Sequence, residues 1–285
     1  MPATLETINY EAILNKDARE ASMLREACKP PPAGKGIFYL DLTGPSGKQI
    51  LLALPKVDQG ILAYFGQPVE TKMNDYREGV ERGFKHPGEV IETFEINYNE
   101  TVDASRGLPP GLQGCKGEIA SVLASGHLIA TTLLAALHPS TTQAPGAGRP
   151  SDSGLKLYLQ DADAARVPAQ SVTAAPHTDM GLLTLLSYDV PYLELAETVK
   201  PPASSTGNGG EGGGKKEAVM GWAPVEPKGG CVVVHVGDAL QAGSRGALHS
   251  PLHRVVQPES PPAGGVCMVV YFLRPEHQQG EPKAA

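Results

Sequence analysis

A histidine and a carboxylate stand two residues apart in the segment "HTDMGLLTLLSYD", where His177 and Asp179 precede a run of alternating Leu and Thr. Imidazole nitrogens and carboxylate oxygens both bind first-row transition metals. The pair alone is weak evidence, because composition would produce one by chance in roughly a third of such chains. A second histidine, His253 in "HSPLHRVVQP", lies on another predicted strand. Two imidazoles and one carboxylate form a facial set that suits non-haem Fe(II) and leaves coordination positions open for other ligands.

Two further histidines compete for a place in this set. His249 lies four residues before His253, so strand alternation predicts that both side chains face the same side. His235, in "VVVHVGD", shares a strand face with Val233 and Cys231. We interpret His235 as a satisfied polar residue of the core rather than a fourth ligand. On the residues alone, His249 and His253 stay open as alternative ligands.

Two charged neighbours of these histidines are expected to be structural. Asp238 follows a glycine, which predicts a turn residue. Arg254 follows His253 directly, so its alternate parity points it away from the metal and toward an ion pair.

The elements that would position these residues change in character near residue 140. Before it, apolar spacing predicts helices over 19–28, 47–66 and 117–137 and a strand over 36–42. From residue 154 onward the apolar residues alternate in short runs bounded by Gly, Pro, Asp or Ser: "GLKLYLQ", "GLLTLLSYDV", "YLELAE", "GWAPVEP", "GCVVVHVGD", "SPLHRVVQP" and "GVCMVVYFLRP". Many short strands without a βαβ rhythm predict a sandwich or barrel.

The predicted organisation is therefore mainly β, with a mixed α/β N-terminal region over 1–140 that packs on a β core over 141–285 as one compact unit. Residues 200–218, "KPPASSTGNGGEGGGKKEA", offer no apolar face that could pack in a core. We expect this segment to be a flexible surface loop inserted between two strands.

Composition narrows the classes of partner. The net charge of −7 argues against nucleic acid or an anionic membrane surface as the main partner. No apolar run of membrane length and no secretory signal were recognised, and the four cysteines are scattered without a CxxC pair. These features predict a cytoplasmic protein with reduced thiols, whose partner is a small molecule.

The chain resembles the isopenicillin-N-synthase-like family of Fe(II) and 2-oxoglutarate-dependent oxygenases. The matching segments are "HTDMGLLTLLSYD", "GWAPVEPKGGCVVVHVGDALQAGSRGALHSPLHRVVQP" and "VVYFLRP", and the first half is also similar, with "REAC", "GIFYLDL" and "RGF". The resemblance implies a double-stranded β-helix (jelly-roll) core with supporting helices. It also implies that His177, Asp179 and His253 bind the iron, because Ser250 and His253 fit the family's pattern of Ser, two residues, His, Arg and Val.

The chain departs from this family where the far carboxylate of 2-oxoglutarate is usually held. The family's Arg-x-Ser pair corresponds to Val266 and Met268, and its Asn-x-Tyr pair corresponds to Tyr158 and Gln160. Tyr158 is kept as a candidate contact for the cosubstrate. The candidate replacement cations are Lys156 and Arg274, but we expect parity to keep Lys156 away from Tyr158 and Arg274 to be solvated.

The resemblance implies an oxidoreductase that uses Fe(II), dioxygen and 2-oxoglutarate to oxidise a small organic metabolite by hydroxylation, desaturation or cyclisation, in specialised metabolism. Apart from the metal ligands, no side chain needs to act as an acid or base. Two alternatives are carried forward. One is an oxidase like isopenicillin N synthase that does not use 2-oxoglutarate, and the other is a non-catalytic binding module on the same fold.

Overall fold

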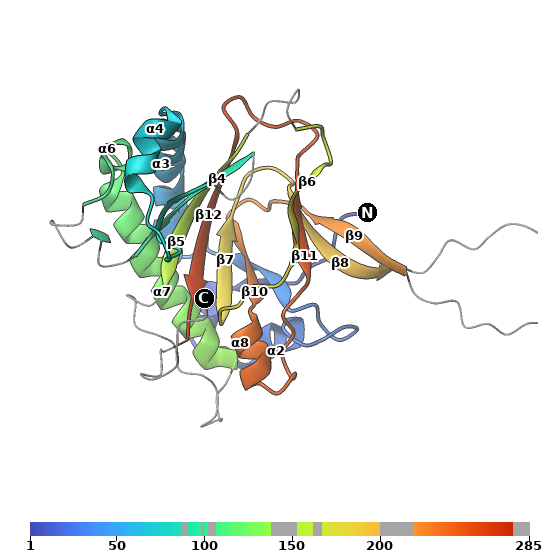
Figure 1. Ribbon diagram of the computed structural model, residues 1–285. Helices are drawn as coiled ribbons and strands as arrows, with labels where there is room; N and C mark the ends of the chain where they lie inside the picture. The colour runs from blue at the N-terminus through green and yellow to red at the C-terminus, as the bar shows by residue number, and fades with distance from the viewer. Residues whose placement is uncertain are drawn as a thin grey trace, which may run out of the picture.

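The computed structural model describes residues 1–86, 90–97, 100–101, 107–137, 153–161, 167–199 and 219–275. Its strands form two sheets (Figure 1). The large sheet has the order β1-β2-β10-β7-β12-β5-β4-β3 and comprises Thr7–Asn9 (β1), Ile37–Asp41 (β2), Gly83–Lys85 (β3), Ile91–Ile96 (β4), Gly154–Gln160 (β5), Leu183–Ser187 (β7), Cys231–Val236 (β10) and Val266–Leu273 (β12). The small sheet has the order β6-β11-β8-β9 and comprises Val172–His177 (β6), Leu193–Val199 (β8), Val219–Val225 (β9) and His253–Val256 (β11).

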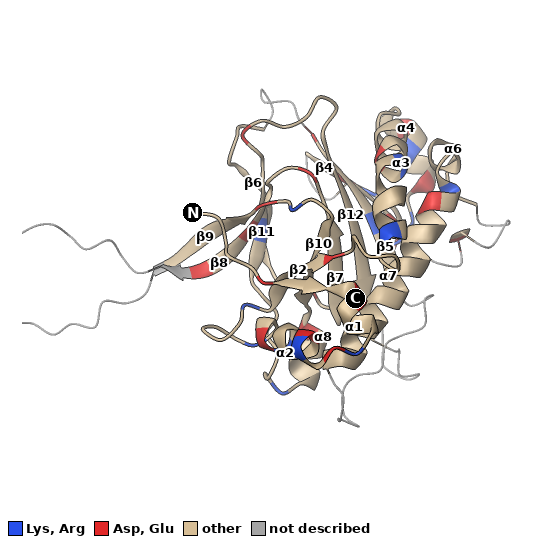
Figure 2. Cartoon of the chain, turned by 180° about the vertical axis from the view of Figure 1, so that it is seen from behind, with Lys and Arg blue, Asp and Glu red and all other residues tan. Residues whose placement is uncertain are grey.

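Helices support the large sheet. They comprise Tyr10–Leu14 (α1), Ala18–Ala27 (α2), Lys48–Phe65 (α3), Val69–Lys72 (α4), Pro110–Gln113 (α6), Lys116–Leu137 (α7), Asp238–Gly243 (α8) and a 3₁₀ turn, Met73–Asp75 (η1). The two long helices, α3 and α7, lie against each other and contact β12 on the side away from the small sheet (Figure 1). In Figure 2 acidic and basic residues are mixed along α2, which carries two arginines and two glutamates.

Alternation along β12 produces two apolar cores, one on each face of the large sheet. The side chains of Val266, Met268 and Val270 lie between the two sheets, where they pack with residues of β8 and β9. Val269 and Tyr271 point the other way, into the core beneath α3 and α7. Because side chains on a strand alternate between its two faces, one eight-residue strand supplies both cores. The face between the sheets is the one that meets the metal-binding candidates.

The N-terminal half does not form a separate layer. Strands β1 and β2 extend the large sheet beyond β10, and β3 and β4 extend it beyond β5. Residues before and after position 140 therefore share one continuous sheet. The predicted loop over 200–218 lies outside the described residues, so its flexibility stays a prediction.

Helix α7 corrects one expectation from the sequence. Over 22 residues it is long and apolar enough to cross a membrane by length and composition, with a mean hydropathy of 1.7. The statement that no apolar run reaches membrane length is therefore wrong for this segment. Its buried face, which includes Ile119, Leu123 and Leu133, packs into the core with α3 and the large sheet. In this structure α7 is a core helix, as its predicted periodicity indicated.

Candidate metal centre

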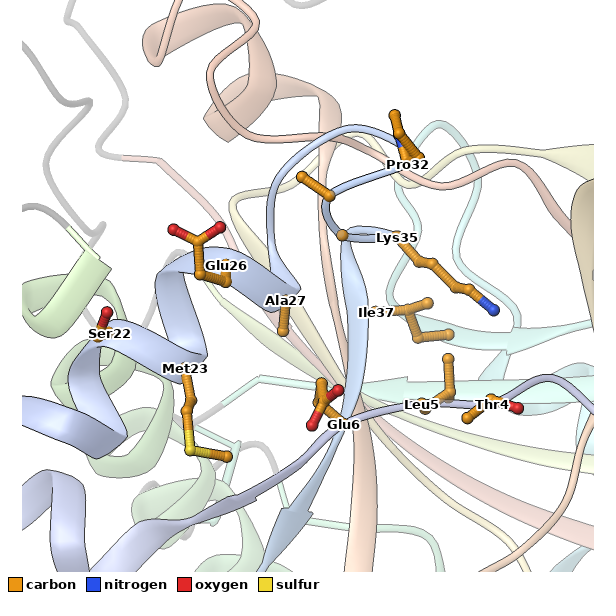
Figure 3. Close-up of a pocket in the computed structure, with 12 residues that line it drawn as sticks. Thr4, Leu5, Glu6, Ser22, Met23, Glu26, Ala27, Pro32, Lys35 and Ile37 are labelled. Carbon is orange, nitrogen blue, oxygen red and sulfur yellow. The ribbon is translucent and has the colours of Figure 1, made fainter.

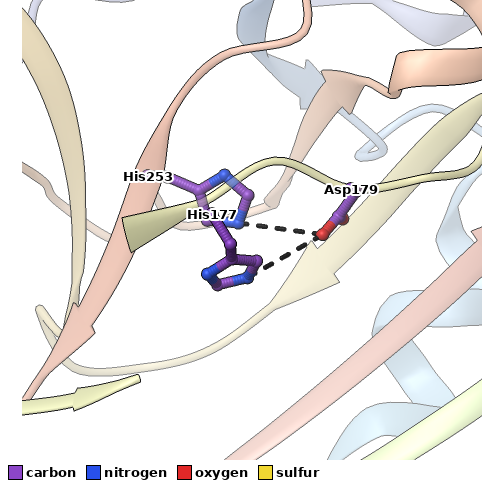
Figure 4. A group of neighbouring side chains, drawn as sticks. All are labelled: His177, Asp179 and His253. Carbon is purple, nitrogen blue, oxygen red and sulfur yellow. Dashed lines mark ion pairs between the residues drawn. The ribbon is translucent and has the colours of Figure 1, made fainter. Parts of the chain in front are cut away.

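Three side chains from separate elements converge at one end of the space between the sheets (Figure 4). His177 ends β6, His253 begins β11, and these two residues are paired directly across the two strands. Asp179 follows in the loop between β6 and β7. The candidate ligand atoms all lie within 4.8 Å of one another, and the Nε2 atom of each histidine is 3.9 Å from Asp179 Oδ1. Oxygen and nitrogen atoms at this spacing can surround a single metal ion.

Backbone carbonyls set the orientation of both imidazoles. His177 Nδ1 lies 2.7 Å from the carbonyl oxygen of Ala175, and His253 Nδ1 lies 3.1 Å from that of Pro251. Because a carbonyl oxygen can only accept a hydrogen bond, each Nδ1 must carry the proton. This tautomer leaves the Nε2 lone pair of each ring directed toward Asp179, as a metal ligand requires.

The two oxygens of Asp179 have different surroundings. Oδ1 faces the two candidate ligand histidines, whereas Oδ2 accepts a hydrogen bond of 2.5 Å from Thr184 Oγ1 and lies 3.6 Å from His235 Nε2. Burial alone would raise the pKa of Asp179, but the nearby His235 and His253 and the Thr184 hydroxyl outweigh it and lower the pKa. Asp179 is therefore an anion, with Oδ1 available to a cation and Oδ2 held by the protein.

His253 is buried and its pKa is lowered to about 4, first by burial and then by the neighbouring His235. A lowered pKa keeps this imidazole neutral near pH 7, and only the neutral ring can bind a metal through Nε2. Two imidazoles and one carboxylate together match the donor set of Fe(II) in facial-triad sites.

The first turn of α8 holds the loop that carries Asp179. The backbone N–H of Asp238 donates to the carbonyl oxygen of Asp179 at 2.7 Å, and Thr178 Oγ1 donates to Asp238 Oδ2 at 2.9 Å. A Cβ on Gly237 would lie 2.1 Å from the carbonyl oxygen of Gly181, so only glycine permits this close approach. Asp238 was predicted as a turn residue, but it starts α8 and helps to fix the metal-binding loop.

Two other residues considered from the sequence, His249 and Arg254, lie outside the metal-binding cluster. His249 is not part of the cluster, and its backbone N–H donates to the backbone carbonyl oxygen of Cys28 at 2.9 Å. Arg254 points away from the metal, as its parity predicted: it pairs with Glu194 at 2.6 Å and its guanidinium lies 4.4 Å from the ring centroid of Trp222.

His235 lies closer to the cluster than the sequence indicated. Its ring is 2% exposed and its centroid is 4.8 Å from that of His253. It shares the inward strand face with Val233 and Cys231, as predicted. It is not satisfied, however, because its buried Nδ1 has no hydrogen-bond partner among the described residues. The sequence could not reveal this proximity, because Asp179 reaches His235 from a loop distant in the chain.

A cavity of about 90 Å³ adjoins the cluster between the two sheets. Ile91, Leu193, Met268, Val270 and Phe272 are among its apolar lining residues, and the described lining contains no Lys or Arg. Tyr158, the candidate contact for the cosubstrate, lines this cavity, and its role stays a prediction. Val266 and Met268 are 1% and 3% exposed within the apolar core. The residues present fit a metal ion, but they do not fit the second carboxylate of 2-oxoglutarate, which needs a cation or several donors.

The two predicted replacement cations are paired elsewhere. Arg274 Nη2 lies 2.7 Å from the buried Glu95, and Lys156 Nζ lies 3.5 Å from Glu95 and 3.1 Å from Glu81. Lys156 does not face away from Tyr158, as strand parity was expected to require, because residues two apart on a strand share a face. Lys156 Nζ accordingly lies 6.0 Å from the ring centroid of Tyr158. Arg274 was expected to be solvated, but it forms an ion pair with Glu95.

A larger cavity of about 510 Å³ lies near the N-terminus, between the segment before β1, helix α2 and the start of β2 (Figure 3). Leu5, Met23 and Ile37 supply apolar lining, and Glu6 and Lys35 supply charge. None of the three candidate metal ligands lines it. Size alone therefore does not identify the reactive site, and the smaller cavity beside His177, Asp179 and His253 is the one that combines space with metal-binding atoms.

Comparisons with known proteins agree with this geometry. A sequence profile described as "2OG-Fe(II) oxygenase superfamily" matches residues 158–275, which include all three candidate ligands. The 2-oxoglutarate-dependent dioxygenase gloE of Glarea lozoyensis is 27% identical over 294 residues, which cover 95% of this chain and 80% of gloE. The 2-oxoglutarate-dependent dioxygenase frbH of a Dothideomycetidae species is 24% identical, covering 96% of this chain and 83% of frbH.

Solved structures share the fold. The Arabidopsis thaliana dioxygenase for auxin oxidation 1, in complex with 2-oxoglutarate, superposes with a TM-score of 0.68 at 17% identity, covering 96% of this chain and 94% of that one. Neurospora crassa T7H, with α-ketoglutarate and 5-formyluracil, gives a TM-score of 0.67 at 19% identity, covering 96% and 86%. The predicted jelly-roll core with supporting helices is confirmed. The profile match over residues 158–275 and the relatives at 24–27% identity show that this chain is similar to members of the 2OG-Fe(II) oxygenase superfamily.

Proposed function

We propose that this chain is a mononuclear Fe(II) dioxygenase, in which a 2-oxo acid and dioxygen oxidise a small organic molecule, and that His177, Asp179 and His253 hold the iron. The observation that carries the proposal is the convergence of two Nε2 atoms and one carboxylate oxygen within 4.8 Å. The fixed tautomers of the two histidines support it, because they leave both lone pairs free. The names of the relatives, which are 2-oxoglutarate-dependent dioxygenases, support the same reaction class.

The bound iron would supply dioxygen activation, and the protein would supply position and surroundings. The Thr184 hydroxyl holds the outer oxygen of Asp179 by a hydrogen bond, with His235 beside it, so that the inner oxygen stays directed at the metal. The apolar wall formed by Phe272, Val270 and Leu193 limits the access of water to the reacting centre. No described side chain needs to transfer a proton in this scheme.

The substrate is proposed to be a small and largely apolar molecule, because most of the cavity lining beside the triad is apolar. A role in specialised metabolism is part of the proposal and rests on the family resemblance alone. A cytoplasmic location is also proposed, on the basis of the four scattered cysteines, which are free in the structure.

Turnover without a known substrate tests the proposed function. Protein purified without oxygen is mixed with Fe(II) and saturating 2-oxoglutarate, then exposed to dioxygen, and succinate and oxygen uptake are measured. We expect iron-dependent succinate formation that is absent in Asp179→Ala. Protein that contains no iron after anaerobic purification with Fe(II) would favour the binding-module alternative and contradict the proposal.

The apolar residues Val266 and Met268 favour the oxidase as a second candidate. An oxidase takes all its electrons from the substrate, so it would consume oxygen with its substrate while releasing no carboxylic acid from any 2-oxo acid. Measuring the oxidised substrate and the carboxylic acid released from the 2-oxo acid in one reaction distinguishes the dioxygenase from the oxidase.

A further inference from the structure

Beyond the metal ligands and His235, the described lining of the cavity contains no charged side chain that could pair with the far carboxylate of 2-oxoglutarate. The strand register shows how the inward residues of β12 lie relative to the metal ligands. Phe272 is paired with Thr184, whose hydroxyl bonds to Asp179. Met268 and Val266 face the same way as Phe272 but lie farther from Asp179 along β12. Met268 is paired with Tyr158, and Val266 with Gln160. The inward face of β12 is therefore apolar from Phe272, near the metal ligands, to Val266, which we call the deep end.

The polar groups at the deep end already bond to one another. Gln160, which is fully buried, donates through Nε2 to the side chain of Gln257 and accepts from Thr173 Oγ1 at 2.8 Å. Gln257 Nε2 in turn donates to the carbonyl oxygen of Asp161 at 3.0 Å. With these amide groups satisfied internally, the network has no spare pair of donors for a carboxylate.

Besides His235 beside the metal ligands, a second polar group of the described lining lacks a hydrogen-bond partner. Tyr192 lines the cavity and is 1% exposed, and its buried hydroxyl has no hydrogen-bond partner among the described residues. Burial raises the pKa of Tyr192 well above its ordinary value, so the phenol stays neutral. A neutral phenol can donate one hydrogen bond to an uncharged acceptor, but it cannot balance a buried carboxylate.

We propose that this subsite selects a 2-oxo acid with an uncharged chain end, which packs against Met268 and can accept a hydrogen bond from Tyr192. We further propose that the subsite binds 2-oxoglutarate only weakly. The inference rests on the proposed function, because the metal must hold the 2-oxo acid at its other end. The overall reaction does not need the second carboxylate. The 2-oxo acid loses carbon dioxide and takes one oxygen atom of dioxygen to become the acid one carbon shorter, while the substrate takes the other atom. Each partner gives two electrons, which together reduce dioxygen.

Binding to the Mn(II)-loaded protein without oxygen tests the proposal apart from turnover. The probes are 2-oxoglutarate, its 5-methyl ester, which keeps the chain length but removes the charge, and 2-oxohexanoate, whose end is aliphatic. Calorimetry should show that both uncharged acids bind at least about tenfold more tightly than 2-oxoglutarate, since an unmatched buried charge costs at least as much as one lost charged hydrogen bond. Tighter binding of 2-oxoglutarate than of either uncharged acid would overturn the proposal.

Two variants locate the subsite. Tyr192→Phe removes only the hydroxyl, so it should weaken binding of the ester by about two- to tenfold and leave 2-oxohexanoate unchanged. Equal weakening of both ligands would overturn the role given to Tyr192. Val266→Arg with Met268→Ser should tighten binding of 2-oxoglutarate by about ten- to a hundredfold. A folded double variant with unchanged affinity would overturn the placement of the subsite.

The same titrations separate this inference from the proposed function. If Mn(II) itself does not bind, the metal centre and the inference both fail. If Mn(II) binds but none of the three 2-oxo acids does, the inference fails while the metal centre stands, and the oxidase becomes the better account.

Discussion

Replacing Thr184 with valine isolates the contribution of one hydrogen bond to the metal centre. Thr184 is 1% exposed, and its hydroxyl donates to Asp179 Oδ2 at 2.5 Å. Valine keeps a similar shape but leaves the outer carboxylate oxygen with only His235, 3.6 Å away. A hydrogen bond to a charged group contributes about 1.5–3 kcal/mol. If the metal-bound state depends on that orientation, the dissociation constant for Fe(II) should rise about ten- to a hundredfold.

Anaerobic titration of the protein with Fe(II), in competition with a chromophoric chelator, measures this change. Thr173→Val is the matched control, because it removes the same group from a strand that also carries a ligand, but its hydroxyl bonds to Gln160 instead of Asp179. The control should retain the affinity of the wild-type protein. A dissociation constant for Thr184→Val within about twofold of wild type would refute the view that Asp179 is oriented through its outer oxygen.

Three further predictions address the scaffold. Strands β8 and β9 pair up to Val199 and Val219, so replacing residues 201–217 with Asn-Gly should leave the thermal midpoint and iron affinity unchanged, and loss of either would show that the segment has a structural or docking role. Burial, and then Asp189, raise the pKa of Asp58 from 3.8 to about 6. The folded state therefore binds more protons than the unfolded state between these values, and stability falls as the pH rises through them. Asp58→Asn should remove this fall in the free energy of unfolding, which is less than about 3 kcal/mol because the carboxyl is only half-buried. Urea denaturation of both proteins below and above this pH range measures the fall. An equal loss of stability in the wild type and the variant would contradict the prediction. The buried Lys72 donates to both oxygens of Glu92 at 2.6 Å, so Lys72→Met should destabilise by about 2–4 kcal/mol, and the added Glu92→Gln should restore part of that in the same assay.

Much of the candidate site followed from local sequence, because strand parity and spacing are local properties. The short runs with period two around His253 and through β12 predicted which residues face inward, and those residues lie between the sheets. Parity also placed His235 and Arg254 on the correct faces. Parity was misapplied to Lys156, which shares its face with Tyr158. It also failed for His249, which precedes β11 and is not on a strand.

The missed features depend on contacts between distant segments. Strand β6 is an edge strand, largely exposed and containing a proline, so it has no apolar alternation to detect. Strand β4 contains Glu95, a buried carboxylate. Its burial depends on ion pairs with Lys156 on β5 and with Arg274 at the end of β12. Likewise, the closeness of His235 to Asp179 and the lack of a partner for the Tyr192 hydroxyl among the described residues depend on how the two sheets meet. No local pattern encodes these relations.

The iron content of protein purified without oxygen, compared between the wild-type chain and Asp179→Ala, tests the central claim most directly. Asp179 supplies the only anionic oxygen in the described ligand cluster, so its loss should remove most of the affinity for the metal. We expect about one iron per wild-type chain, as one facial triad holds one ion, and little or none in the variant, with both proteins showing the same circular dichroism. Equal iron content in the two proteins, or none in either, would contradict the assignment of His177, Asp179 and His253 as the iron site.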